Sequence, residues 1–219
     1  PAPISLRSRV HDYGGGVLCS GMDGETLLLV WIADGALWRQ DWRLPLLGDN
    51  RPEPLMAPLK LTRDGDWQLA DGLLDLSRRR WLGIREINGV DQLVSADLDA
   101  TEQEPKLRHQ PADFAGYGCL SADGTQLAWV EWQQPAMPWQ SSELWCADLS
   151  PSGELTEARA IAGGEGVSVF QPQWLPDGSL LVAEDSDGWW NLKRRRPGAI
   201  SWEHPWPMAA ETAMPQWIY

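Results

Sequence analysis

With 219 residues, of which 43% are hydrophobic and 22% charged, the chain has the composition of a soluble globular protein and the length of one large all-β domain. Its formal net charge of −13 repels phosphate backbones, so we expect no nucleic-acid partner. No apolar run approaches the ~18 residues of a membrane-spanning helix, so we expect no membrane partner either.

Four segments share one pattern, a turn followed by a short apolar run. In three of them the turn is an Asp-Gly pair, which favours a tight hairpin because Gly tolerates a positive φ. In the remaining one an arginine run, residues 78–80, stands at the turn. We expect that run, and the second basic cluster at residues 193–196, on solvated turns or edge strands. The segments are residues 19–32, 73–86, 119–132 and 173–186.

A second strand-like phrase follows each apolar run, and a third stretch closes each unit. Four leucines occupy matching places in the second phrase: Leu37, Leu93, Leu144 and Leu192. One unit is therefore about four short strands in roughly 50 residues, the size of a β-propeller blade. We predict an all-β fold, a partial β-propeller with about four blades of four antiparallel strands. The blade-like units lie near residues 13–65, 66–112, 113–166 and 167–210.

The last residues, "PQWIY" at 215–219, read as the first strand of a further unit. A propeller closes by pairing its last blade with its first, and four blades plus one strand do not close neatly. We therefore expect this chain to be a fragment of a larger propeller. We expect its 15 tryptophans to fill the gaps between wedge-shaped blades, with an aromatic platform for sugars as the alternative.

The cysteine and histidine content is low. An odd count of three cysteines without a Cys-x-x-Cys pair argues against a disulfide framework, and with only three histidines a zinc site is unsupported. We expect Cys19, Cys119 and Cys146 to be small buried hydrophobic residues in a reducing compartment, the cytoplasm. We predict no metal and no cofactor.

The phrase "QPQWLPDGSLLVAEDSDGWWNL", residues 171–192, resembles a repeat found in the propellers of the prolyl oligopeptidase family of serine peptidases and in the periplasmic Tol-system propeller. Three further stretches, in this order, are similar to the N-terminal propeller of the bacterial dipeptidyl-aminopeptidase or acylaminoacyl-peptidase-like branch. They are "SRVHDYGGG" (8–16), residues 127–149 and "FQPQWLPDG" (170–178). The resemblance covers nearly the whole chain.

The resemblance implies a two-domain parent, in which the propeller filters peptides by size above an α/β-hydrolase domain with a Ser-Asp-His triad. That catalytic domain would follow Tyr219 and is absent here. The chain has no G-x-S-x-G motif; the nearest serine, Ser168, is followed by Phe170 where the second Gly should stand. We therefore predict no catalytic residue in this chain.

The expected function is a non-catalytic, substrate-gating propeller of a serine peptidase that hydrolyses short peptides. Its partners would be the peptide substrate and the hydrolase domain of the same parent chain. The alternative is a stand-alone binding module of the Tol-system type that recognises a protein or peptide. A Trp-lined lectin is a third possibility.

The stretch "SRVHDYGGG" contains three candidate site residues. If it is extended, Arg9, His11 and Tyr13 share one face, because alternate residues of a strand point the same way. Arg9 could then hold a carboxylate, and His11 would titrate near neutral pH, at a domain interface. The alternative is a strand-end hydrogen-bond cluster that anchors the first blade.

Glu131 and Trp132 are the other candidates, because they follow a buried strand and precede a Pro-rich loop. A carboxylate there could bind a substrate ammonium group, and the alternative is a solvated strand end. The sequence "DSDG", residues 185–188, faintly resembles a calcium loop, but the later ligands are missing, so we interpret it as a tight turn.

Overall fold

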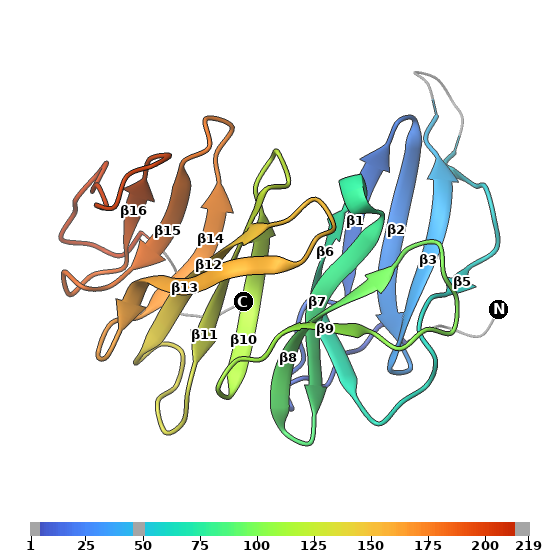
Figure 1. Ribbon diagram of the computed structural model, residues 1–219, viewed down its shortest axis with the longest axis horizontal. Helices are drawn as coiled ribbons and strands as arrows, with labels where there is room; N and C mark the ends of the chain where they lie inside the picture. The colour runs from blue at the N-terminus through green and yellow to red at the C-terminus, as the bar shows by residue number, and fades with distance from the viewer. Residues whose placement is uncertain (1–4, 46–50, 213–219) are drawn as a thin grey trace. The chain divides into compact units, whose positions relative to one another are not determined.

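The computed structural model describes residues 5–45 and 51–212 (Figure 1). These residues form sixteen β-strands and one short 3-10 helix, and none of them lies in an α-helix. The strands pair into four antiparallel sheets, which confirms the predicted all-β fold. The chain divides into two compact units, residues 1–110 and 111–219, with two sheets in each. Within the described residues no helix has the length and apolarity needed to span a membrane.

The first unit contains two sheets. In the first sheet β1 to β4 pair in chain order, and β5 also pairs with β3; in the second sheet β6 to β9 pair in chain order. The strands of the first sheet are β1 (Leu18–Asp23), β2 (Thr26–Ala33), β3 (Ala36–Arg43), β4 (Glu53–Pro54) and β5 (Leu59–Lys60). Those of the second sheet are β6 (Gln68–Asp75), β7 (Arg80–Ile87), β8 (Val90–Asp97) and β9 (Lys106–His109).

The second unit also contains two sheets, one of four strands and one of three. The four-stranded sheet consists of β10 (Phe114–Leu120), β11 (Gln126–Trp132), β12 (Ser142–Leu149) and β13 (Leu155–Gly164). The three-stranded sheet consists of β14 (Val169–Trp174), β15 (Leu180–Glu184) and β16 (Asn191–Arg195). The predicted first strand of a further unit, residues 215–219, lies outside the described residues.

The last sheet departs from the predicted four strands. Up to residue 212, where the described part of the chain ends, an isolated bridge between Arg194 and Glu203 stands in place of the fourth strand, with two backbone hydrogen bonds of 2.9 and 2.7 Å. Pro205 and Pro207 follow at once, and proline has no N–H to donate to a strand ladder. The pairing therefore stops after one bridge.

The predicted Asp-Gly turns are present. Gly124 and Gly178 have φ values of 69° and 77°, and each donates its N–H to a carbonyl three residues earlier. At the arginine run the chain makes the 3-10 helix η1 (Leu76–Arg78) instead, and Arg79 takes a left-handed conformation with a φ of 50°. Asp75 caps this helix by accepting a backbone hydrogen bond of 3.3 Å.

The first strand of three sheets carries the same β-bulge. In each case two residues stand opposite one residue of the next strand, and the first of the two has a positive φ. A left-handed conformation costs a non-glycine residue roughly 1–2 kcal/mol, so neighbouring contacts must hold it there. The sequence pattern did not indicate these bulges. The left-handed residues are Asp71, Tyr117 and Gln171, with φ values of 52°, 56° and 50°.

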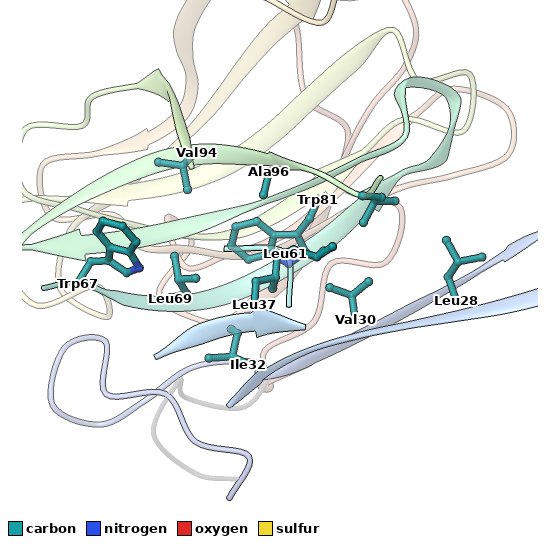
Figure 2. Close-up of a cluster of buried hydrophobic side chains, with 11 residues drawn as sticks. Leu28, Val30, Ile32, Leu37, Leu61, Trp67, Leu69, Trp81, Val94 and Ala96 are labelled. Carbon is teal, nitrogen blue, oxygen red and sulfur yellow. The ribbon is translucent and has the colours of Figure 1, made fainter. Parts of the chain in front are cut away.

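Apolar side chains fill the space between the two sheets of the first unit. Figure 2 shows this cluster of eleven buried residues, which come from β2 and β3 of one sheet, from β6, β7 and β8 of the other, and from the adjoining loops. Trp81 is the largest fully buried member, with 1% of its surface exposed. Gly83 leaves room for its ring, because a Cβ atom there would lie 2.2 Å from a ring carbon of Trp81.

The sheets of the second unit pack in the same way, with Val130 of β11 and Val182 of β15 in one cluster. The packing role predicted for tryptophan is confirmed for Trp81, which belongs to the buried cluster between the two sheets of the first unit. It is wrong for Trp206, which is 66% exposed.

Ion pairs connect the two sheets of the first unit at their charged ends. Asp99, just after β8, lies 2.5 Å from Arg79 and 2.7 Å from Arg39 of β3. Arg79 also lies 2.6 Å from Asp23 at the end of β1. The hydrogen bonds from Arg79 and Arg39 lower the pKa of Asp99 to about 2.

The expectation that the basic clusters lie on solvated turns or edge strands is confirmed in position, since Arg78 and Arg79 lie at the η1 turn and Lys193 belongs to the edge strand β16. It is wrong in solvation for two of the side chains. Arg80 and Lys193 are each only 5% exposed, and both lie within 3.2 Å of a carboxylate. Burying a cation is costly unless a carboxylate offsets the loss of hydration. Asp75 does so for Arg80, and Glu184 does so for Lys193.

Trp81→Ala should lower the free energy of unfolding by about 3–5 kcal/mol, because it removes a buried aromatic ring and leaves a cavity between two sheets. Urea denaturation followed by circular dichroism measures this change. Trp206→Ala, at an exposed position, is the matched control and should stay within about 0.5 kcal/mol of the parent. Equal losses for the two variants would contradict the packing described for Trp81.

Asp99→Asn should destabilise the first unit at neutral pH and progressively less in acid. A carboxylate with a lowered pKa stabilises the fold above its unfolded pKa, and this contribution is lost as pH falls through the folded value. The difference from the parent should therefore shrink between pH 3.8 and about 2. Unfolding curves at several pH values test this. Asp64→Asn is the control, because the side chain of Asp64 is 81% exposed where it pairs with Lys60. Its loss should lower the free energy of unfolding by no more than about 1 kcal/mol.

Candidate functional site

The stretch "SRVHDYGGG" forms a turn and not the extended segment predicted from its sequence. The N–H of Asp12 donates to the carbonyl of Arg9 at 3.0 Å, and the N–H of Gly14 donates to that of Val10 at 2.9 Å. His11 and Asp12 both have positive φ values, 56° and 61°. Two consecutive left-handed residues reverse the chain, so the prediction that alternate side chains share one strand face is wrong.

His11 is held by two carboxylates of the second sheet. Its Nε2 atom lies 2.6 Å from Oδ2 of Asp91, whose side chain is fully buried. Its backbone N–H donates to Oε2 of Glu86 at 2.6 Å. Burial by itself would lower the pKa of His11, but the hydrogen bond to Asp91 and the charges of Asp91, Glu86 and Asp71 outweigh burial and raise it. The imidazolium form is therefore favoured in this environment.

The other two candidates of this stretch are open to solvent. The side chain of Arg9 is exposed, and Tyr13 is 80% exposed. Carboxylate binding by Arg9 stays a prediction. The anchoring role that the sequence left as the alternative agrees with the contacts of His11.

The glycine run after the turn allows a close approach to β6. The N–H of Gly16 donates to Oδ1 of Asp71 at 2.6 Å, and the N–H of Asp71 donates back to the carbonyl of Gly16 at 2.9 Å. A Cβ atom on Gly15 would lie 2.8 Å from Cβ of Ala70 and 2.8 Å from Oδ1 of Asp71. Glycine is therefore required where the chain passes the bulge of β6.

Glu131 lies in a different environment from the one predicted. It is 7% exposed, so it is not a solvated strand end, and its Oε1 accepts a hydrogen bond of 2.6 Å from the indole N–H of Trp129. Trp132 is half-buried and stacks on Phe114, with ring centroids 5.6 Å apart. Trp132 also packs against the apolar cluster of the second unit. Ammonium binding by Glu131 stays a prediction.

Sequence reasoning missed the three carboxylates that meet the N-terminal turn, Asp71, Glu86 and Asp91. Glu86 and Asp91 flank the Asn88–Gly89 turn that joins β7 to β8. An Asn-Gly pair between two strands is a strong hairpin signal, and it places these two acidic residues opposite each other. That signal was available in the sequence, whereas their contact with His11 was not.

Side chains that could act as nucleophiles have structural roles. Ser168 is fully buried; its hydroxyl donates to the carbonyl of Pro138, and its N–H donates to Oδ1 of Asp185 at 2.7 Å. Burial raises the pKa of Cys19 and of Cys119 to about 12, so both thiols stay protonated at neutral pH. These groups are poorly suited to attack a carbonyl.

The structure shows a turn at "DSDG", where the N–H of Gly188 donates to the carbonyl of Asp185 at 2.8 Å. Across residues 5–45 and 51–212 no group of three or more His, Cys, Asp or Glu side chains could hold a metal ion. Close to this turn, Asp187 lies 3.0 Å from His204 and 3.2 Å from Lys193. These contacts tie the chain after β16 to the last sheet.

Glu131→Ala should lower the free energy of unfolding by about 1–3 kcal/mol, because the buried indole N–H of Trp129 loses the carboxylate to which it donates. Glu131→Gln keeps an acceptor oxygen and should cost less than half as much. Glu143→Ala is the matched control, since Glu143 is half-buried and accepts a longer bond, 3.1 Å, from Trp145. Chemical denaturation measures all three, and an unchanged stability of Glu131→Ala would contradict the structural role.

Comparisons with family models and with curated proteins find no match. Among solved structures, the chain is similar to puromycin hydrolase, with 30% identity and a TM-score of 0.83 over 99% of this chain and 34% of that one. A puromycin-hydrolyzing peptidase of Mycobacterium tuberculosis gives 28% identity and a TM-score of 0.80, again over 99% and 34%. A putative TolB from Agrobacterium tumefaciens gives 19% identity and a TM-score of 0.59 over 89% and 62%, a likeness of fold alone.

The chain thus spans about a third of the length of the two peptidase structures that it matches. Its four sheets correspond to the propeller portion of puromycin hydrolase, which agrees with the repeat found in the sequence. The fold and the similarity together show a partial β-propeller that resembles the propeller portion of puromycin hydrolase.

Proposed function

We propose that this chain is a non-catalytic, substrate-gating propeller domain of a serine peptidase that hydrolyses short peptides. The similarity to puromycin hydrolase over 99% of the chain, at 30% identity, is the observation that carries this proposal. The name of that protein and that of the Mycobacterium tuberculosis peptidase both describe hydrolysis. The substrate of the present protein would be a short peptide or a related aminoacyl amide.

In this proposal the chemistry takes place in an α/β-hydrolase domain of the same parent chain, which carries the nucleophile. The absence of a G-x-S-x-G motif from the sequence agrees with this division of work. The occupied hydroxyl of Ser168 and the protonated thiols of Cys19 and Cys119 agree with it too. The protein would act in the cytoplasm, without a nucleic-acid, membrane, metal or cofactor partner.

Gating by steric exclusion requires a wall that does not yield to a large substrate. The sheets of this chain meet that requirement locally, because fully buried side chains such as Trp81 and Leu144 lie in close-packed clusters. The ion pairs of Asp99 add a second connection between the sheets of the first unit. A short or unfolded peptide could pass through an opening bounded by such rigid sheets, whereas a folded protein could not.

The runner-up function is a stand-alone propeller that binds a protein or peptide without hydrolysing it. The likeness to TolB, with a TM-score of 0.59, favours keeping this alternative. The two functions differ in whether a serine-dependent hydrolysis accompanies binding.

The intact protein that carries this chain should hydrolyse chromogenic di- and tripeptides, and a serine-reactive phosphonate should abolish the activity. Peptides of increasing length should be cleaved with falling kcat/KM, because the propeller restricts entry.

Asp99→Asn, which weakens a contact between two sheets, should raise kcat/KM for long peptides relative to short ones. Ser168→Ala should retain phosphonate-sensitive activity in the folded protein, because Ser168 is not the nucleophile.

Binding of peptides without hydrolysis would overturn the peptidase proposal and favour the stand-alone module. Hydrolysis with equal efficiency for short peptides, long peptides and folded proteins would overturn gating alone.

A further inference from the structure

The N-terminal segment, residues 5–17, contacts both sheets of the first unit. At its end, the carbonyl of Val17 accepts a hydrogen bond of 2.9 Å from the N–H of Ile32 in β2. Leu6 forms a β-bridge with Ala33 at the end of β2. His11 contacts Glu86 and Asp91 of the second sheet, and Gly16 exchanges two hydrogen bonds with Asp71 of β6. Figure 1 shows that this segment then runs directly into β1. We call residues 5–17 the N-terminal arm.

The carboxylates that act on His11 come from three strands of the second sheet. Asp71 belongs to β6, Glu86 to β7 and Asp91 to β8. Within the arm's own turn the charged or titratable neighbours are Arg9, Asp12 and Tyr13. The imidazole of His11 therefore lies in a negatively charged environment. One of the three carboxylates, that of Asp91, has no exposed side-chain surface.

A buried carboxylate is costly unless a cation or hydrogen-bond donors compensate it. The imidazolium of His11 compensates Asp91 with both charge and a hydrogen bond at 2.6 Å. Neutral imidazole keeps at most the hydrogen bond, because only its uncharged N–H remains to donate. The attraction between arm and sheet is therefore stronger while His11 carries its second proton.

The turn itself opposes docking. Its residues His11 and Asp12 are left-handed, and each such residue costs roughly 1–2 kcal/mol, so contacts outside the turn must hold it. The hydrogen bonds to Glu86 and Asp91 are contacts of this kind at His11. Weakening them favours relaxation of the turn.

We propose that the N-terminal arm is a pH-sensitive latch, docked on the second sheet when His11 is protonated and loosened when His11 is neutral. Because Gly16 lies at the end of the arm, loosening also weakens its two hydrogen bonds to Asp71 at the bulge of β6. The latch thus controls how firmly the start of β1 is held to the first strand of the neighbouring sheet. It stands on contacts within the first unit and does not require the proposed peptidase function.

The direction of the pH dependence follows from the raised pKa of His11. A histidine whose pKa is raised by docking stabilises the docked state fully below its free pKa of 6.5, and this contribution is lost as pH rises through the docked pKa. The latch therefore holds in mild acid and loosens as the pH rises through the docked pKa of His11.

Hydrogen–deuterium exchange of the intact protein between pH 6 and pH 9 tests the latch, after correction for the intrinsic pH dependence of exchange. The reporters are the backbone N–H groups of His11, Gly14 and Gly16, all of which are hydrogen-bonded in the docked arm. Their protection should fall as pH rises, by at most about tenfold for each unit between the docked and free pKa of His11.

His11→Gln cannot take up a proton, so its arm should exchange faster than that of the parent at pH 6 and should lose the pH dependence. Glu86→Gln keeps an acceptor for the His11 N–H but removes one charge, so its pH dependence should be shallower. His204→Gln, which disrupts a different His–Asp pair at 3.0 Å in the second unit, is the matched control and should leave the arm unchanged.

A nuclear magnetic resonance titration of the His11 ring in the parent protein keeps the proposal falsifiable if a variant fails to fold. The ring should titrate above 6.5. A ring pKa at or below that value, a pH-independent protection of the arm, or an unchanged slope in His11→Gln would each overturn the latch. Peptide hydrolysis does not enter any of these readouts, so failure of the latch is distinguishable from failure of the proposed function.

Discussion

The fold depends on the covering of each sheet's apolar face by another sheet. A small twisted sheet cannot bury its own hydrophobic side chains, and within each unit the neighbouring sheet supplies the cover. Trp81 illustrates the constraint, because its ring is buried between two sheets and needs Gly72 and Gly83 to remain without side chains. The polar features of the chain are arranged around this packing.

Charge is used in this protein mainly to hold elements together. Asp99 joins Arg39 and Arg79 across the sheets of the first unit, and Lys193 is buried beside Glu184. Charged clusters in a sequence often indicate a binding surface, but here their side chains form ion pairs within the fold. The hydroxyl of Ser168 likewise donates a hydrogen bond within the fold, and burial keeps the thiols of Cys19 and Cys119 protonated.

The N-terminal arm shows how one titratable group acquires a role through its position. A histidine at this point of the sequence is unremarkable, but three carboxylates from three strands converge on it, and the glycines after it let the chain reach β6. The arm connects this acidic environment to the start of β1. The proposed latch and the proposed gating therefore act on the same packing between sheets, one through charge and the other through rigidity.

The architecture could be predicted from local residue patterns. The Asp-Gly turns, apolar runs and recurring leucines of the sequence specify short antiparallel strands in repeated units, because turn conformation and strand burial depend on local residue types. The sequence also carried the likeness to the peptidase propellers, and the absence of a nucleophile motif. Local patterns did not predict the end of the last sheet after three strands, or the β-bulge of β6 at Asp71.

The environments of the candidate residues, in contrast, depend on long-range contacts that form on folding. The tertiary structure folded Arg9, His11 and Tyr13 into a turn, buried Glu131 against Trp129, and paired His11 with Asp91, which is 80 residues away in the sequence. The physical reason is that the burial, charge and pKa of a side chain are set by residues distant in sequence, which no local pattern contains.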